Sequence, residues 1–102
     1  MHQHCGIEKT LKLIGSKWSM LILHNLFDGP KRFGQLEALL GGISPKTLSL
    51  RLKELEAEKI IKKKVFAQVP LKVEYSLTEK GLSLGEIFKK IDKWGEKESH
   101  LS

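Results

Sequence analysis

The sequence predicts a mainly α-helical domain with one small β-hairpin, the arrangement called a winged helix-turn-helix. A two-turn helix that stops at a pair of glycines is followed at once by a helix capped by Ser-Pro. Two short strand-like segments come next, and a helix with a long apolar stripe closes the chain. We expect a single domain over residues 1–102, with the helix-turn-helix at about 33–58, the wing at about 60–77 and a C-terminal dimerisation helix at about 78–98.

Composition limits what the chain can be. Its 102 residues are 40% hydrophobic and 29% charged, which is typical of one globular domain with a modest core. So small a domain buries a limited share of its surface, and we expect a partner subunit to cover part of it. No apolar run reaches the ~18 residues of a membrane span, and the N-terminus lacks a signal-peptide pattern. We expect a cytoplasmic protein that does not bind membranes, and a single cysteine, Cys5, agrees with a reducing compartment.

Three helices are expected before the Ser-Pro cap. Residues 7–14 carry apolar side chains at helical spacing and stop at a glycine. Residues 17–27 form a second helix that is apolar on more than one side and ends at an Asp-Gly-Pro turn. Residues 33–40 form the third, closed by glycines that readily take the left-handed conformation past a helix end.

The next helix begins at Ser44. Serine is a favourable N-cap, and Pro45 occupies the first helical position, where a missing N–H costs nothing. Leu48, Leu52 and Leu55 fall on one narrow arc and should face the core. The second helix of a helix-turn-helix reads the DNA major groove with its N-terminal half. We therefore expect Lys46, Thr47, Ser49, Leu50 and Lys53 to lie at or near base edges, with Ser44 and Arg51 contacting the DNA backbone.

Basic charge is concentrated in the same part of the chain. Between Ser44 and Lys72, eight lysines and arginines stand against three glutamates, which places +5 of the net charge of +6 in this segment. The glutamates follow the reading half of the helix, where they would not repel phosphate. Cations gathered in one segment suit a phosphate-rich ligand, because each contact releases condensed counterions. A solvated basic face is the alternative for a run of lysines alone.

A hairpin and a last helix complete the chain. Residues 60–66 and 72–77 are β-branched and aromatic, and the loop between them contains Pro70. Four lysines should line this wing near phosphates or the minor groove: Lys62, Lys63, Lys64 and Lys72. Thr78 then caps one long helix whose apolar stripe exceeds what the domain can cover. We expect that stripe to form a homodimer interface through Leu84, Ile87, Phe88, Ile91 and Trp94.

Several motifs along the chain match a known pattern. They are Gly-x-Lys-Trp at 15–18, Asp-Gly-Pro-x-Arg-Phe at 28–33, Ile-Ser at 43–44, Arg-Leu-x-x-Leu at 51–55 and Tyr-x-Leu-Thr-x-x-Gly at 75–81. From Cys5 to about Trp94 the sequence resembles the HxlR-type winged helix-turn-helix transcriptional regulators. The resemblance implies a homodimer with paired terminal helices, which presents two reading helices to a pseudo-palindromic operator on double-stranded DNA. One departure is Gly6, where the family usually has proline after the cysteine.

Cys5 is a candidate redox sensor. A thiol just before a helix N-terminus, with Lys9 nearby, is in a setting that favours the reactive thiolate. Some members of the resembled family sense oxidants or electrophiles through an N-terminal cysteine. An inert surface thiol is the alternative, and the sequence leaves the identity of any effector open, whether it is a redox signal or a small molecule.

Other classes of function have less support. The sequence shows no pattern of a Ser/His/Asp or Cys/His catalytic set and no glycine-rich phosphate-binding loop, so we expect neither an enzyme nor a cofactor. His2, His4 and Cys5 could begin a metal site, but a closed zinc site needs four ligands and no second cluster has suitable spacing. A winged-helix module that binds proteins through its basic surface is the remaining alternative. That module would need more exposed apolar residues than Leu50 on the reading helix.

Overall fold

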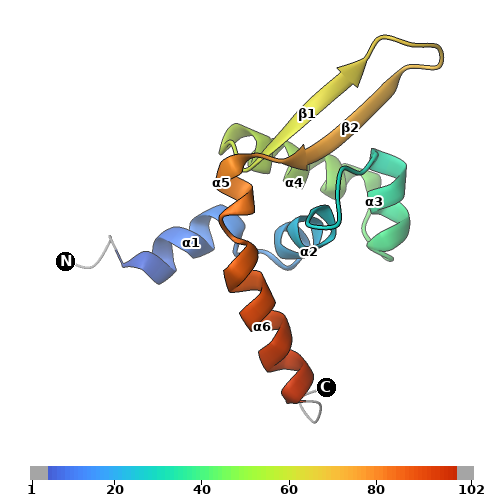
Figure 1. Cartoon of the computed structure of the whole chain (residues 1–102). Helices are drawn as coiled ribbons and strands as arrows, with labels where there is room; N and C mark the ends of the chain where they lie inside the picture. Colours follow the sequence, from blue (N-terminus) through green and yellow to red (C-terminus); the bar gives the residue numbers. More distant parts are fainter. Residues whose placement is uncertain (1–4, 99–102) are drawn as a thin grey trace.

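The computed structural model describes residues 5–98, in which a helical body carries a projecting hairpin (Figure 1). This confirms the predicted mainly α-helical winged fold. Two further helices extend from the body, one at each end of the chain (Figure 1). The elements in chain order are α1 (Gly6–Ile14), α2 (Lys17–Leu26), α3 (Phe33–Leu39), α4 (Pro45–Ala57), β1 (Ile61–Phe66), β2 (Lys72–Leu77), α5 (Glu79–Leu82) and α6 (Gly85–Lys97).

The core lies where α2, α3 and α4 meet the root of the hairpin. Leu48, Leu52 and Leu55 of α4 are at most 2% exposed, which confirms the face predicted for them. They pack with fully buried side chains of α2 and α3, including Ile22 and Leu36. Burying each of these side chains contributes about 1.5–3 kcal/mol, so the orientation of α4 about its own axis is strongly determined.

The turn between α3 and α4 is held by local contacts. Gly42 takes a φ of +96°, a conformation that favours glycine, and the chain then enters α4. Ser44 Oγ accepts a hydrogen bond of 3.1 Å from the backbone N–H of Thr47, and Pro45 stands at the first helical position. The predicted N-cap is therefore confirmed.

A corner made by four residues joins α4, the hairpin and α5. The hydroxyl of Thr78 lies 2.6 Å from the carbonyl oxygen of Lys59 and 3.0 Å from that of Ile60, and can donate to either. Thr78 Oγ1 accepts the N–H of Gly81 at 3.2 Å, which caps α5 as the sequence predicted. Lys59 takes a φ of +60° to make the turn out of α4. We call these four residues the Thr78 corner.

The hairpin is antiparallel and is anchored at its base. Leu77 of β2 is buried, and Tyr75 packs against the core. Tyr75 also exchanges backbone hydrogen bonds of 2.8 and 3.0 Å with Lys31, so the segment before α3 runs beside β2. The outer half of the hairpin extends beyond the helical body (Figure 1).

The prediction of one continuous C-terminal helix from Thr78 is wrong, because α5 and α6 are separate helices. The break falls at Ser83, whose hydroxyl donates 2.6 Å to the carbonyl of Lys80, a bond that competes with helix continuation. Leu84 follows with an N–H bonded to the carbonyl of Gly81, three residues back, and packs against the core. The chain then leaves in a new direction as α6 (Figure 1).

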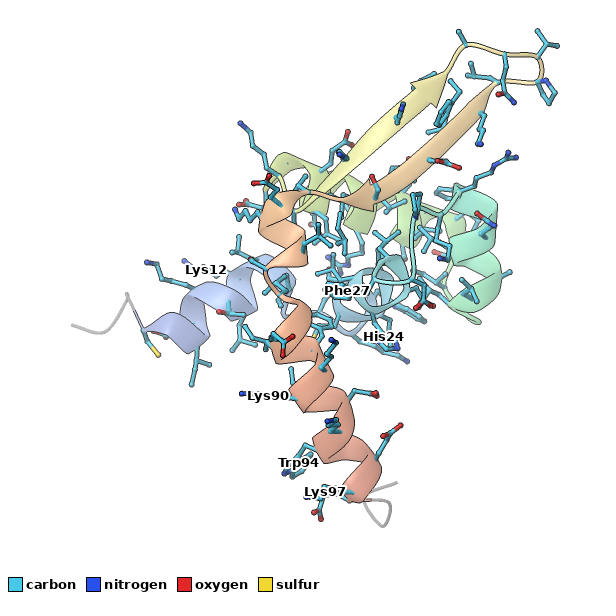
Figure 2. All side chains as sticks on the ribbon, in the orientation of Figure 1. Lys12, His24, Phe27, Lys90, Trp94 and Lys97 are labelled. Atoms are coloured by element: carbon cyan, nitrogen blue, oxygen red, sulfur yellow. The ribbon has the colours of Figure 1, made fainter. Side chains whose placement is uncertain are left out.

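The two terminal helices expose apolar side chains. In α1, Ile7 is 71% exposed and Leu11 is 57% exposed. In α6, the large hydrophobic side chains open to solvent are Ile87, Ile91 and Trp94. Figure 2 shows Trp94 extending from α6 away from α2. Exposed apolar groups on neighbouring turns of a helix commonly mark an interface.

The Thr78 corner gives a testable prediction about Gly81. A methyl group at this position would collide with the carbonyl oxygen of Ile60 and lie 3.0 Å from the Leu77 side chain. We expect Gly81→Ala to destabilise the protein by about 1–3 kcal/mol in chemical denaturation. Gly34→Ala is the matched control, because nothing lies within 4 Å of a Cβ there and alanine favours a helix. Equal stability of the two variants would contradict this account of the corner.

Candidate nucleic-acid interface

α4 presents a polar and basic face away from the core. Lys46, Leu50 and Lys53 are exposed on it, and Thr47 and Ser49 are half-buried beside them. The structure thus brings together the five residues that the sequence placed at or near base edges. No acidic residue occurs in α4 before Glu54, so its N-terminal half combines lysines with the positive end of the helix dipole.

Ser44 and Thr47 are already engaged with each other. The hydroxyl of Ser44 donates to Thr47 Oγ1 at 2.9 Å, in addition to accepting the Thr47 N–H. Both residues lie at the first turn of α4, where backbone N–H groups without helical partners can bind an anion. The geometry of this turn suits a phosphate contact better than a base contact.

Arg51 lies apart from the lysines of α4. Its guanidinium binds Glu54 at 2.8 Å, and its side chain is 30% exposed. Its Nε is buried without a partner among the described residues. The side chain lines a hollow between α1 and α4, together with Lys12 and Glu58. Arg51 therefore lies beside α1, and its expected contact with the DNA backbone stays a prediction.

Strand register divides the wing lysines between two faces. Lys62 lies opposite Ser76, Lys64 opposite Glu74, and Phe66 opposite Lys72, and these pairs share one face of the hairpin. Lys63 lies opposite Tyr75 on the other face. We call the side that carries Lys62, Lys64, Phe66 and Lys72 the basic face of the wing. Of the four lysines predicted to line the wing, three meet there and Lys63 does not.

Phe66 organises the basic face, a role that the sequence did not predict. The ammonium of Lys64 lies 4.9 Å from the centre of the Phe66 ring, and that of Lys72 lies 4.7 Å from it. Lys72 also forms an ion pair of 3.3 Å with Glu74. Cation–π contacts at exposed sites contribute about 0.5–1 kcal/mol each, enough to restrict two otherwise mobile side chains. The sequence did contain a signal for this contact, because Lys64 and Phe66 are two residues apart on a predicted strand and therefore share a face.

The wing tip is apolar. Val69 is fully exposed and Leu71 is 66% exposed in the loop between β1 and β2. These side chains do not pack against the core, and they lie at the far end of the hairpin, beyond the lysines. A tip of this kind can contact sugars or base edges in a minor groove, where apolar side chains are common.

Cys5 is exposed and lies at the N-cap of α1. Its carbonyl accepts the N–H of Lys9 at 3.0 Å, and its side chain makes no capping hydrogen bond.

His2 and His4, the other possible metal ligands near Cys5, lie outside the described residues. Within residues 5–98, no group of three or more His, Cys, Asp and Glu side chains could hold a metal ion. In the same part of the chain, no helix is both long enough and apolar enough to cross a bilayer.

Known proteins share this architecture. The sequence model of a family described as HxlR-like helix-turn-helix matches residues 13–101. Bacillus subtilis (strain 168) has an uncharacterized HTH-type transcriptional regulator, YdeP, that is 45% identical over 93 residues, or 91% of this chain and 73% of YdeP. The similar regulator BH0655 of Halalkalibacterium halodurans is 51% identical over 89 residues, or 86% of this chain and 79% of BH0655.

A solved structure extends the comparison to three dimensions. The redox regulator HypR in its oxidized form matches with a TM-score of 0.87 and 43% identity. The match covers 91% of this chain and 96% of the HypR chain. The arrangement of helices and wing described above is thus shared with a known regulator.

The basic face of the wing gives a prediction for binding to duplex DNA. We expect Lys64→Ala or Lys72→Ala to weaken binding to all sequences alike and to reduce the slope of log affinity against log salt by about one. Phe66→Leu should weaken binding too, because it releases both ammonium groups. Lys63→Ala is the control from the opposite face and should change the slope less. An altered base preference with an unchanged slope at Lys64 or Lys72 would refute the phosphate assignment.

Proposed function

Since the chain belongs to the HxlR-like helix-turn-helix family, we propose that it is a transcriptional regulator that binds a specific pseudo-palindromic operator as a homodimer in the cytoplasm. The observation that carries the proposal is the outward face of α4. Before its first acid, Glu54, this helix carries Lys46, Ser49 and Lys53 on its outward face, and buried leucines fix the opposite face. A helix of this kind fits the major groove.

The wing supports the same mode of binding. Its basic face lies beyond the end of α4 in the chain and would meet phosphates next to the groove that α4 enters. Three lysines on one face can each release a counterion, and two of them are held in place by Phe66. Base contacts by α4 then give sequence preference, while the wing adds affinity that depends on salt.

A protein-binding role for the same surface has less support. Protein interfaces are enriched in aromatic side chains and Met at their centre, and depleted in Lys. On the outward face of α4, Leu50 is a single large apolar side chain among lysines and hydroxyl groups, and it is 50% exposed. One isolated leucine among cations suits a contact with a thymine methyl group better than a protein interface.

The proposed dimer uses the terminal helices. Ile87, Ile91 and Trp94 of α6 are between 49% and 60% exposed, and the exposed Ile7 and Leu11 of α1 offer a second apolar strip. Two copies related by a two-fold axis could bury these strips against each other. Two half-sites held at fixed spacing are also what selectivity in a genome requires.

Phe88 and Leu84 pack mainly inside their own subunit and not against the proposed partner. Phe88 is 7% exposed and packs on Phe27 of its own chain, with ring centres 5.3 Å apart. Leu84 is half-buried against the same core. They therefore support α6 from within the subunit, and the partner would meet mainly Ile87, Ile91 and Trp94.

The signal that controls the regulator is either a redox change or a small molecule. HypR, which matches this chain over nearly its whole length, is a redox regulator. Cys5 is exposed at the start of α1, one of the two helices assigned to the dimer. Oxidation there would change the surface that two subunits share.

Selection of duplexes from a random pool at defined salt tests the function. We expect enrichment of a pseudo-palindromic site with two half-sites about one helical turn apart, because two α4 helices must reach one side of the duplex. The variant with both Lys46→Ala and Ser49→Ala should lose the preference and keep weak binding that depends on salt. A pool without enriched sequences would reject the proposal.

Truncating exposed side chains of α6 tests the dimer. Since a single interface hot spot contributes at least about 2 kcal/mol, Ile91→Ala with Trp94→Ala should raise the dimer dissociation constant by at least about thirtyfold in sedimentation equilibrium. Leu39→Ala is the control, because Leu39 is similarly exposed at 53% but lies on α3. A dimer of unchanged affinity, or a wild-type monomer that binds the operator as one copy, would contradict the interface.

A further inference from the structure

A cavity of about 500 Å³ separates the end of α2 from the start of α6. Pockets of this size accommodate small organic ligands. A smaller hollow of about 210 Å³ adjoins it and shares His24, Phe88 and Asp92 with it. Figure 2 labels His24 in α2 and Phe27 directly after α2, beside the upper turns of α6. The DNA-binding surfaces of α4 and the wing do not line either hollow.

Aromatic rings form the apolar wall of the cavity. Phe27 and Phe88 pack at an angle of 55°, with their centres 5.3 Å apart. Gly85 keeps the wall open, because a Cβ there would already lie 3.5 Å from Cε1 of Phe27, and a longer side chain would cover the ring. The adjoining hollow adds Met20, Leu21 and Ile91 as a further apolar surface. A ligand with an apolar or aromatic body would fit these walls.

The rim of the cavity is acidic although the protein carries a net charge of +6. Asp28, Glu86 and Asp92 line it, against a single cation, Lys89. Lys89 pairs with Glu86 at 3.7 Å, and Glu86 also complements the positive end of α6. Asp28 and Asp92 form no ion pair within the described part of the chain, and Asp28 follows the negative end of α2. Two uncompensated carboxylates beside aromatic rings are suited to a cation.

We propose that this cavity binds an organic cation, a molecule with a positively charged nitrogen and an apolar or aromatic body, as an effector of the regulator. The nitrogen would lie between Asp28 and Asp92, and the body against Phe27 and Phe88. The effector role rests on the proposed function. Because the cavity is walled by α2 on one side and α6 on the other, a bound ligand would move α6, and with it the proposed dimer interface, relative to α4. The spacing of the two reading helices would then change.

Three probes with one apolar body and different head groups test the site by calorimetry on the full chain. They are phenylbutyltrimethylammonium, phenylbutanol and phenylbutyrate. We expect the ammonium compound to bind about tenfold more tightly than the alcohol, and phenylbutyrate to bind most weakly. Asp28→Asn with Asp92→Asn should lower affinity for the ammonium compound about fivefold and leave that for the alcohol unchanged. Gly85→Leu should abolish binding of both.

Glu96→Gln removes an acid of α6 that does not line the cavity, and it should change no affinity. The site is refuted if the ammonium compound gives no binding, if phenylbutyrate binds as tightly, or if the two aspartate substitutions have no effect.

Duplex affinity with and without the ammonium compound tests the effector role separately. We expect at least a threefold change, and an unchanged duplex affinity would refute that role. Failure of the proposed function itself would appear differently, as the absence of any selected duplex.

Discussion

The rest of the structure depends on the hydrogen bonds of Thr78. Its hydroxyl donates to the carbonyl of either Lys59 or Ile60, its Oγ1 accepts from the N–H of Gly81, and its own N–H donates to the carbonyl of Ile60 at 3.0 Å. Lys80 adds a bond of 2.9 Å to the carbonyl of Glu58 at the end of α4. The end of the reading helix, the root of the wing and the start of α5 thus meet at one point, where the backbone is closely packed and no side chain fits at Gly81.

Three surfaces take their relative positions from this corner: the basic face of the wing, the exposed apolar side of α6 and the cavity between α2 and α6. The basic face of the wing is fixed to the C-terminal end of α4. When α4 enters a groove of DNA, the position of the wing lysines on the duplex is therefore determined as well. After α5, the break at Ser83 sends α6 away from the body, which leaves Ile87, Ile91 and Trp94 exposed. The same change of direction opens the cavity between α2 and α6. A shift of α6 can therefore alter the proposed dimer without disturbing how one subunit meets DNA.

Local chemistry explains what could be predicted from the sequence. The Ser44 cap, the buried leucines of α4 and the two strands follow from spacing within single elements, and the structure has each of them. The break between α5 and α6 was not predicted, because Leu84 at the junction packs against a core that forms only in the folded chain. Phe88 is buried because it packs on Phe27, which is also distant in sequence. The pairing of Phe66 with Lys72 depends on the register that the loop imposes.

The central claim is that two copies of α4 enter the major groove of one duplex. Methylation of guanine N7, an atom in the floor of that groove, tests it most directly. When methylated duplexes carrying a selected site are separated into bound and free fractions, the account predicts two short stretches where methylation blocks binding, about 10–10.5 base pairs apart from centre to centre. A single stretch, or binding that is indifferent to N7 methylation throughout, would contradict it.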